Sequence, residues 1–254
     1  MDKGIYLAST SIKVDKLRQQ NQTHEMANLA TVGFKKNFQM TQATYRVDGE
    51  NSLSSRFYKV ADTLGRVDLS AGPRIVTDNP LDIFIEGQGV LGVLNENGEI
   101  AFTRRGDLRV SQDGNLVNGS GFTIAAEGGG DIQIDPALIH KISQEGVIYA
   151  SNPADEVAQE VEVARLLLRN AEDTDLEKTE DGLFKVMGTE NPGDFVGAAG
   201  PVTITTFGLE GSSVKSYDVL TRMIEIERSY ELKVNVIKEL GDMSETSQSL
   251  MQVS

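Results

Sequence analysis

The segment from residue 214 to residue 240 reads VKSYDVLTRMIEIERSYELKVNVIKEL and contains neither glycine nor proline. Within it, apolar side chains recur at alternating steps of four and three residues, a spacing that places them on one narrow face of a long helix. We expect this face to pair with a second helix as a coiled-coil-like seam; packing on the chain's own β core is the alternative. The seam consists of Val219, Met223, Ile226, Tyr230, Lys233, Ile237 and Leu240.

The N-terminal segment also predicts a helix. Residues 4–30 contain no proline, and no glycine after Gly4, and they are rich in residues that favour helix. Gly33 lies where a residue in the left-handed conformation would end this helix, and Phe34 would fold back as the apolar contact of such a cap. The apolar stripe of the helix is thin and consists of Ile5, Ala8, Ile12, Met26 and Leu29.

From about residue 81 to residue 206 the apolar pattern changes to a period of two, which indicates strands. Short strands separated by turn dipeptides, such as Asn97-Gly98 and Asp181-Gly182, predict a small β-sandwich or barrel. Residues 154–170 fit either a strand or a helix. The expected strands are residues 82–86, 108–110, 131–134 and 202–205.

These patterns together predict an α+β fold. Residues 1–35 and 208–254 would form a helical inner domain in which the two terminal helices pair. Residues 81–207 would form an all-β outer domain, sandwich-like or barrel-like. Residues 36–80 are expected to be an extended linker, although the sequence leaves open a further helix there.

The net charge of −14 is carried almost entirely by the middle of the chain. Residues 51–200 contain 12 basic and 25 acidic side chains, whereas residues 1–50 contain 7 and 5, and residues 201–254 contain 5 and 8. Because like charges oppose close packing, the nearly neutral ends suit burial against copies of the same chain better than the acidic middle does. The acidic balance also argues against a nucleic-acid partner, which would require clustered lysine and arginine.

Composition limits the location of the protein as well. No apolar stretch approaches the roughly 20 residues needed to cross a bilayer, so we expect no membrane insertion. The chain starts MDKGIY, without the apolar region of a secretory signal, and we expect any export to use a route without a cleaved signal peptide. The absence of cysteine excludes disulfides, thiolate catalysis and cysteine-bound metals.

The best argument for an enzyme is the sequence GQGVLG at residues 87–92, which has the glycine spacing of a dinucleotide-binding loop. That loop requires a helix to begin at Gly92, whereas the Asn97-Gly98 turn follows almost at once. Two β-turn glycines are therefore the preferred interpretation. We expect no catalytic site and no cofactor.

A metal site is not expected either. The acidic run at residues 173–177 begins like a calcium loop, but Lys178 stands where the loop needs glycine. His24 and His140 are the only histidines, and they lack the spacing of metal ligands.

Three blocks of the sequence resemble motifs of the bacterial flagellar rod and hook proteins, the axial proteins of the flagellum. Residues 24–35 (HEMANLATVGFK) are similar to the rod signature NNLANxxTxGFK, with His24, Glu25 and Met26 as departures. Residues 79–117 contain NPLDIFIEGQG, FTRRGDLRV and DGNLV, which resemble PLDxxIxGxG, [YF]TRxGxLxV and xGxLV. Residues 208–215 (GLEGSSVK) resemble Gx[LV]ExSNV. The three blocks follow one another in the family's order.

The resemblance implies a structural, non-catalytic subunit with a helical inner domain and a β-rich outer domain. Its length and its start favour a subunit of the proximal rod, and a distal rod protein is the nearest alternative. Such proteins leave the cell through the flagellar type III export apparatus. They polymerise helically, with copies of themselves and with neighbouring rod proteins, into the periplasmic drive shaft of the basal body, which carries motor torque to the hook and filament. A free β-domain binding module is the alternative from a different class.

The resemblance and the helical patterns also select the residues expected to serve assembly. Asn28 and Thr31 either satisfy backbone groups near the first helix end or are ordinary exposed polar residues. Glu210 and Ser212 are expected to cap the last helix. Arg104, with its neighbour Arg105, is expected on a solvated hairpin edge rather than in ion pairs between subunits. The full set is Ala27, Asn28, Thr31, Gly33, Phe34, Leu209, Glu210, Ser212, Val219, Met223, Ile226, Tyr230, Ile237 and Leu240.

Overall fold

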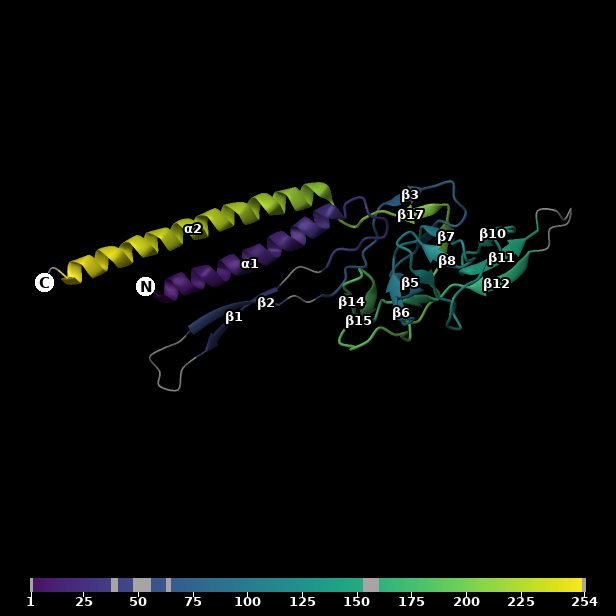
Figure 1. Cartoon of the computed structure of the whole chain (residues 1–254), viewed down its shortest axis with the longest axis horizontal. Coiled ribbons are helices and arrows are strands. Elements are labelled where there is room, and N and C mark those ends of the chain that lie inside the picture. Colours follow the sequence, from purple (N-terminus) through teal and green to yellow (C-terminus); the bar gives the residue numbers. More distant parts are fainter. Residues whose placement is uncertain (1, 38–40, 48–55, 63–64, 153–159, 253–254) are drawn as a thin grey trace. The chain divides into compact units, whose positions relative to one another are not determined.

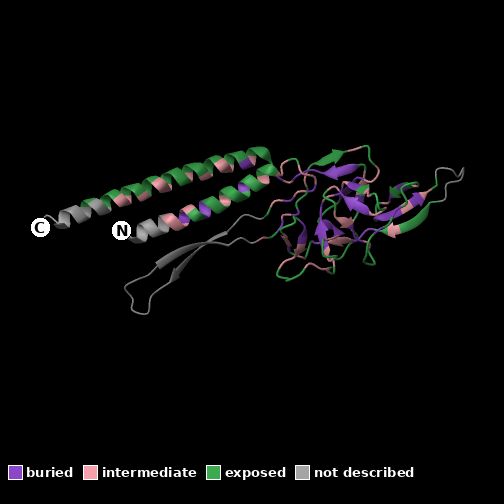
Figure 2. Cartoon of the chain, in the orientation of Figure 1, coloured by how far each residue is buried: buried purple, intermediate pink, exposed green. Residues whose placement is uncertain are grey.

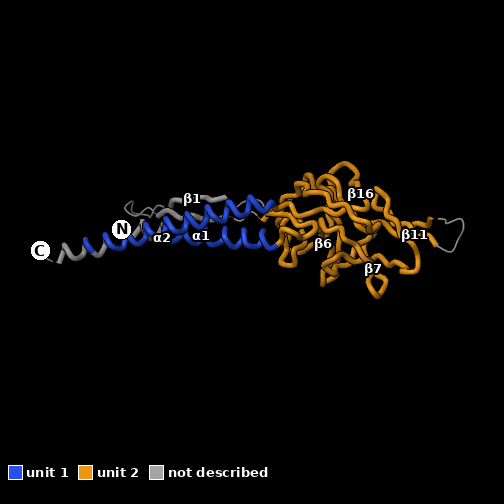
Figure 3. Tube along the Cα trace, turned by 90° about the horizontal axis from the view of Figure 1, so that it is seen from above, with its two compact units in different colours: residues 1–27, 39–64, 215–254 blue, residues 28–38, 65–214 orange. Residues whose placement is uncertain are grey.

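The computed structural model describes residues 2–37, 41–47, 56–62, 65–152 and 160–252. The chain forms two compact units (Figure 3). Unit 1 comprises residues 1–27, 39–64 and 215–254, and unit 2 comprises residues 28–38 and 65–214. Both ends of the chain therefore belong to unit 1, and the middle of the chain makes up most of unit 2.

Two long helices dominate unit 1 (Figure 1). Helix α1 spans Asp2–Ala27 and helix α2 spans Ser216–Gln252, so both predicted helices are confirmed. They lie side by side and run antiparallel, because Asp15 of α1 contacts Lys233 of α2 whereas Glu25 lies 3.9 Å from Arg222. No helix among the described residues is long and apolar enough to span a membrane.

A β-hairpin completes the described part of unit 1. Strand β1 spans Thr41–Val47 and strand β2 spans Arg56–Asp62. They pair antiparallel over their full length, from Thr41 opposite Asp62 to Val47 opposite Arg56. These strands lie within the segment 36–80.

The largest sheet of unit 2 is formed around strand β5, which pairs with three other strands. All pairs in this sheet are antiparallel. Its strands, in spatial order, are β14 (Leu176–Lys178), β15 (Phe184–Val186), β6 (Ile100–Thr103), β5 (Gly89–Leu94), β9 (Thr123–Ile124), β8 (Leu116–Asn118) and β7 (Leu108–Val110), with β13 (Leu168–Asn170) also paired to β5.

Three smaller sheets complete unit 2. One contains β10 (Ile139–Ile142), β11 (Val147–Ser151) and β12 (Val161–Arg165), the second β16 (Ile204–Thr206) and β4 (Ile83–Ile85), and the third β17 (Gly208–Glu210) and β3 (Arg74–Val76). The segment that fitted either a strand or a helix therefore contributes β12 and β13, while its residues 154–159 lie outside the described part of the chain.

Buried residues gather on the strands of unit 2 (Figure 2), and its core follows from the alternation of side chains along them. On β5, Leu91 and Val93 point into one apolar cluster, whereas Val90 points into another. Neighbouring β6 alternates in the same way, with Ala101 in the first cluster and Phe102 in the second. The sheet is thus covered by apolar side chains on both faces.

The observed fold is α+β, with terminal helices and a β-rich middle, as the sequence predicted. Of the expected strands, residues 131–134 form only isolated bridges. The expectation of a barrel is not met: the largest sheet that the described residues form is open, because β14 and β7 end it on its two sides. Gly89 and Gly92, the glycines of the supposed dinucleotide loop, lie within strand β5, so the helix that such a loop requires is replaced by a strand.

Candidate functional site

Three charged side chains meet in the interior of unit 2. The carboxylate of Glu210, on β17, accepts hydrogen bonds from Lys35 Nζ at 2.7 Å through Oε1 and from Arg104 Nε at 2.7 Å through Oε2. All three side chains are at most 1% exposed. We call Lys35, Arg104 and Glu210 the buried charge cluster. Charges removed from water are tolerated only where such pairing compensates the lost hydration.

Backbone groups satisfy the remaining polar atoms of the cluster. Arg104 Nη1 donates to the carbonyl oxygens of Gly87 at 3.0 Å and Gly89 at 2.6 Å, and its Nη2 donates to Ile85 at 2.9 Å. Lys35 Nζ donates to the Ser70 carbonyl at 2.6 Å, and Glu210 Oε1 also accepts from the Gly72 amide at 2.7 Å. The two cations thus connect the loop before β5 and the segment before β3 to one carboxylate.

The electrostatics of the cluster favour a charged Glu210. Burial by itself would raise the pKa of Glu210, but the hydrogen bond and charge of Arg104, with the charge of Lys35, hold this pKa below its ordinary value. Burial, with the nearby charge of Arg104, lowers the pKa of Lys35 despite the attraction of Glu210. The cluster carries a formal excess of one positive charge.

The three blocks of the resemblance meet at this cluster, since each block contributes one of its charges. Gly33 N donates to the Glu210 carbonyl at 2.7 Å, Ser213 N donates to the Phe34 carbonyl at 3.0 Å, and Lys36 N donates to Ser213 Oγ at 3.0 Å. Residues 33–36 therefore run beside residues 210–213. Segments 175 residues apart in sequence are joined by backbone as well as by charge.

Gly33 has the positive φ that the sequence predicted, at +68°. It does not end helix α1, because that helix already ends at Ala27. Its role is to allow a close approach: a Cβ at Gly33 would lie 2.6 Å from the carbonyl carbon of Arg104. The chain leaves the helix early because the residues after it bind to segment 210–213 instead.

The structure corrects three other expectations. Glu210 and Ser212 do not cap the last helix, because α2 begins only at Ser216, the Glu210 carboxylate belongs to the cluster, and Ser212 Oγ accepts from Val214 N at 3.3 Å. Arg104 does not lie on a solvated edge; it is buried. Arg105 is partly exposed and pairs with Asp107 at 2.7 Å.

The other predicted site residues of the first block (residues 24–35) and of the third block (residues 208–215) lie in local surroundings of their own. Thr31 Oγ1 donates to Asn28 Oδ1 at 3.1 Å, so these two side chains bind each other. Ala27 is the exposed last residue of α1. The ring of Phe34 lies 3.8 Å from Lys178 Nζ, a cation–π contact. Leu209 is buried on β17, opposite Ile75.

Most residues of the predicted seam of α2 are buried or only partly exposed within unit 1. Val219 is buried, whereas Tyr230 is exposed. Lys233, the polar member of the seam, contacts the buried Asp15 of α1, and Ser229 Oγ lies 3.1 Å from the same carboxylate. A single polar pair in an apolar seam fixes how two helices align. The partly exposed seam residues are Met223, Ile226, Lys233, Ile237 and Leu240.

Sequence reasoning missed Lys35 and Arg104. A signal for both was present, because the resembled patterns fix a lysine in the first block, an arginine in the second and a glutamate in the third, beside the aspartate of the second.

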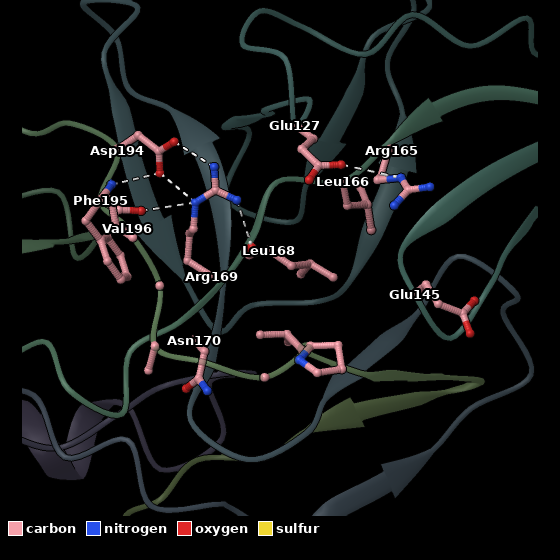
Figure 4. Close-up of a pocket in the computed structure, with 15 residues that line it drawn as sticks. Glu127, Glu145, Arg165, Leu166, Leu168, Arg169, Asn170, Asp194, Phe195 and Val196 are labelled. Carbon is pink, nitrogen blue, oxygen red and sulfur yellow. Dashed lines mark hydrogen bonds and ion pairs between the residues drawn. The ribbon is translucent and has the colours of Figure 1, made fainter.

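A hollow of about 660 Å³ lies elsewhere in unit 2, beside β13 (Figure 4). Its arginines are already paired: Arg169 Nε and Nη2 bind Asp194 at 2.9 and 2.8 Å, and Arg165 lies 3.4 Å from Glu127. Among the described residues, no group of three or more His, Asp or Glu side chains could hold a metal ion. The two arginines that line the hollow therefore already pair with carboxylates of the chain and are not free to bind a ligand's charge.

Comparison with known proteins agrees with this picture. Residues 84–150 match the family model of the flagellar hook protein FlgE/F/G D1 domain, and residues 208–250 match that of the flagellar basal body rod FlgEFG protein C-terminal region. The chain is 30% identical over 256 residues to the flagellar basal-body rod protein FlgF of Salmonella typhimurium and 28% identical to FlgF of Escherichia coli, covering 100% of each chain in both cases. It is 23% identical to the rod protein FlgG of Caulobacter vibrioides, over 98% of this chain and 99% of that one.

The terminal helix pair, the β-rich unit and the convergence of the three motif blocks define a structural subunit of the flagellar axial class. Within that class, the chain belongs to the family of flagellar basal-body rod proteins that includes FlgF.

Proposed function

We propose that this chain is a structural, non-catalytic subunit of the proximal rod of the flagellar basal body. It would polymerise helically with copies of itself and with neighbouring rod proteins, and the resulting shaft would transmit motor torque. The full-length similarity to the two FlgF proteins favours the proximal position.

The observation that carries the proposal is the apolar surface of α2. Beyond the face directed at α1, this helix carries large apolar side chains that are 47–67% exposed: Tyr217, Leu220, Ile224, Tyr230, Leu232, Val236 and Met243. Covering apolar area stabilises by roughly 25 cal/mol per Å². A helix with so much exposed apolar surface gains stability by packing against further helices, as assembly would provide.

The same proposal extends to the predicted domains. Helices from residues 1–35 and 208–254 would pair as a coiled-coil-like inner domain, with Asp15 and Lys233 setting their alignment. Residues 36–80 would connect it to the outer domain of residues 81–207. Contacts between successive subunits would be head-to-tail. Because such contacts need not close into a ring, repeated addition of subunits gives a filament.

Export and location follow from the proposed role. The subunit would pass through the flagellar type III export apparatus and occupy the periplasmic part of the basal body. Helices that gain much of their stability from assembly would suit a chain that must cross the apparatus unfolded.

Electron microscopy of basal bodies from cells lacking this protein tests the proposal. We expect rods that stop at their proximal part, and restored rods when the chain is supplied again. Rods that form normally at the proximal level but stop further out would instead favour a distal rod protein, to which the FlgG similarity points.

A pair of neighbouring substitutions on α2 tests the surface itself. Leu220→Asp places a charge on the exposed apolar surface, whereas Thr221→Asp places the same charge on an adjacent exposed polar position. We expect the first to abolish rod assembly and the second to leave it intact, with little change in helix content for either. Equal assembly of both variants would refute the role of this surface.

A further inference from the structure

Exposed apolar side chains in unit 2 gather on the edge strand β3. Ile75 and Val76 are 47% and 77% exposed, and Phe207, just before β17, is 47% exposed. The Thr77 amide donates to the Phe207 carbonyl at 3.0 Å, and Val76 lies opposite Gly208. The three residues therefore belong to one continuous ribbon, in which Ile75 and Val76 point to opposite faces because side chains alternate along a strand. We call Ile75, Val76 and Phe207 the β3 ridge.

Phe207 is held in an unfavourable conformation at this ridge. Its φ is +57°, and no other non-glycine residue in the described part of the chain has a positive φ. A left-handed conformation costs an L residue roughly 1–2 kcal/mol. Such strain persists only where the surroundings enforce it, and it is typical of functional positions. Here the strained residue is a half-exposed aromatic side chain, so the cost is not offset by full burial within unit 2.

A second apolar edge lies on β12. This strand ends the three-stranded sheet, and within the described ranges no strand pairs with its outer side. Val161 and Val163 are 61% and 42% exposed, with the exposed Glu162 between them. We call Val161, Glu162 and Val163 the β12 edge. Figure 2 shows both β3 and β12 as exposed strands of unit 2.

The two edges are complementary. Among the described strands, β3 pairs only with β17 and β12 only with β11, so the outer side of each offers a template for adding a strand. Each also carries two exposed β-branched side chains, and the one charged residue of β3 is the basic Arg74 whereas that of the β12 edge is the acidic Glu162. Neither edge is complementary in charge to itself. The pairing is therefore heterologous, and a heterologous contact that does not close extends into a helical array.

We propose that the β3 ridge of one copy docks on the β12 edge of the next copy, pairing the two edge strands and bringing Arg74 close to Glu162. The contact rests on the proposed function, since it places a second copy beside the first. It adds a β-strand interface in unit 2 to the helical one in unit 1. Each contact is small, and its repetition along the assembly supplies the avidity.

Cross-linking tests the contact directly, because the chain contains no cysteine of its own. In basal bodies that contain the full-length double variant Val76→Cys/Val163→Cys, mild oxidation should give a ladder of dimers and larger oligomers. The single variants are the matched controls and should give no ladder, since a head-to-tail contact then holds only one cysteine.

Each other outcome decides a separate question. A double variant that enters basal bodies without forming a ladder overturns the contact and leaves the proposed function intact. Self-cross-linking of the Val76→Cys single variant overturns the head-to-tail geometry. A cross-link to a different protein overturns the proposal that a second copy of this chain binds the β3 ridge. Absence of the unsubstituted chain from basal bodies would instead overturn the proposed function.

Two further variants separate assembly from folding. Phe207→Gly relieves the strain, so the free chain should melt at the same temperature or higher while the ladder weakens severalfold. Val196→Gly, at a more exposed apolar residue outside both edges, should not change the ladder. Arg74→Glu should also weaken the ladder, and adding Glu162→Arg should restore it. A lower melting temperature for Phe207→Gly with an unchanged ladder would overturn the proposal.

Discussion

In unit 2 three charged side chains lie almost wholly out of contact with water, whereas in unit 1 the described side chains of one helix, α2, include seven large apolar ones that are exposed to it. Unit 2 contains its own apolar core, and its buried Lys35 and Arg104 both pair with Glu210. Unit 1 has a narrow helix–helix seam and apolar surface left over. The contrast supports the proposal that unit 2 folds around its own core without another chain, whereas the helices of unit 1 gain much of their stability from other chains.

The largest effect should come from opening the buried charge cluster. Glu210→Ala leaves Lys35 and Arg104 buried without a counter-charge, and breaking such a pair costs about 3–5 kcal/mol. Urea denaturation, followed by hydrogen exchange of the unit 2 strands, measures the loss. As the matched control, Glu96→Ala at an exposed turn should change stability by less than about 0.5 kcal/mol. A loss below about 1 kcal/mol for Glu210→Ala would mean that unit 2 does not depend on the cluster.

The next effect concerns how closely segment 33–36 approaches Arg104. Gly33→Ala introduces both a positive-φ strain and a contact with rigid backbone, whereas Gly87→Ala, at φ +57°, introduces the strain with no atom within 4 Å. We expect Gly87→Ala to cost about 1–2 kcal/mol and Gly33→Ala clearly more. Thermal melting of both variants gives the difference. Equal losses of stability would show that Gly33→Ala costs only the strain of the positive φ and that the close approach to Arg104 adds nothing.

Acid should destabilise unit 2 through Glu210. Its pKa is lower in the folded chain than its ordinary value of 4.5, so the folded state binds fewer protons than the unfolded state. The stability that the carboxylate contributes is complete above 4.5 and is lost as the pH falls from there through the folded pKa. Denaturation midpoints measured from pH 7 to pH 3 should therefore fall more steeply for the natural chain than for Glu210→Gln. Parallel curves would argue against this linkage.

The smallest effect is expected at the polar pair of the helix seam. Lys233→Leu alone leaves Asp15 buried without its cation and should destabilise unit 1 by about 1 kcal/mol or more. The double variant Asp15→Ala/Lys233→Leu should recover at least that loss, because an apolar replacement of a buried ion pair is often neutral or stabilising. Circular dichroism at 222 nm during urea titration follows the helices. Additive losses would indicate that the two side chains do not act as a pair.

Periodicity predicted the two helices well, because a long apolar seam records the contact of one helix with another in local sequence. The positive φ of Gly33 was predicted from its place after the first helix, as a cap, whereas in the structure it allows the close approach to Arg104. The end of α1 at Ala27 was not predictable in this way, since the turn away from the helix depends on hydrogen bonds to residues 210–213.

The buried charge cluster was missed for a related reason. Charged residues are almost always exposed, so a sequence taken alone places Arg104 at the surface. Its burial follows from pairing with Glu210, 106 residues away. Only the motif patterns, which fix Lys35, Arg104 and Glu210, hinted at the pairing. The same limit applies to Glu210, whose motif position next to the last helix suggested a cap.

Hydrogen exchange of the full-length free chain, compared with the same chain in isolated basal bodies, tests most directly whether unit 1 is completed by assembly. The account predicts that the strands of unit 2, apart from the edge strands β3 and β12, are protected equally in both, whereas α1 and α2 exchange readily in the free chain and become protected in the basal body. Strong protection throughout both helices in the free chain would contradict it.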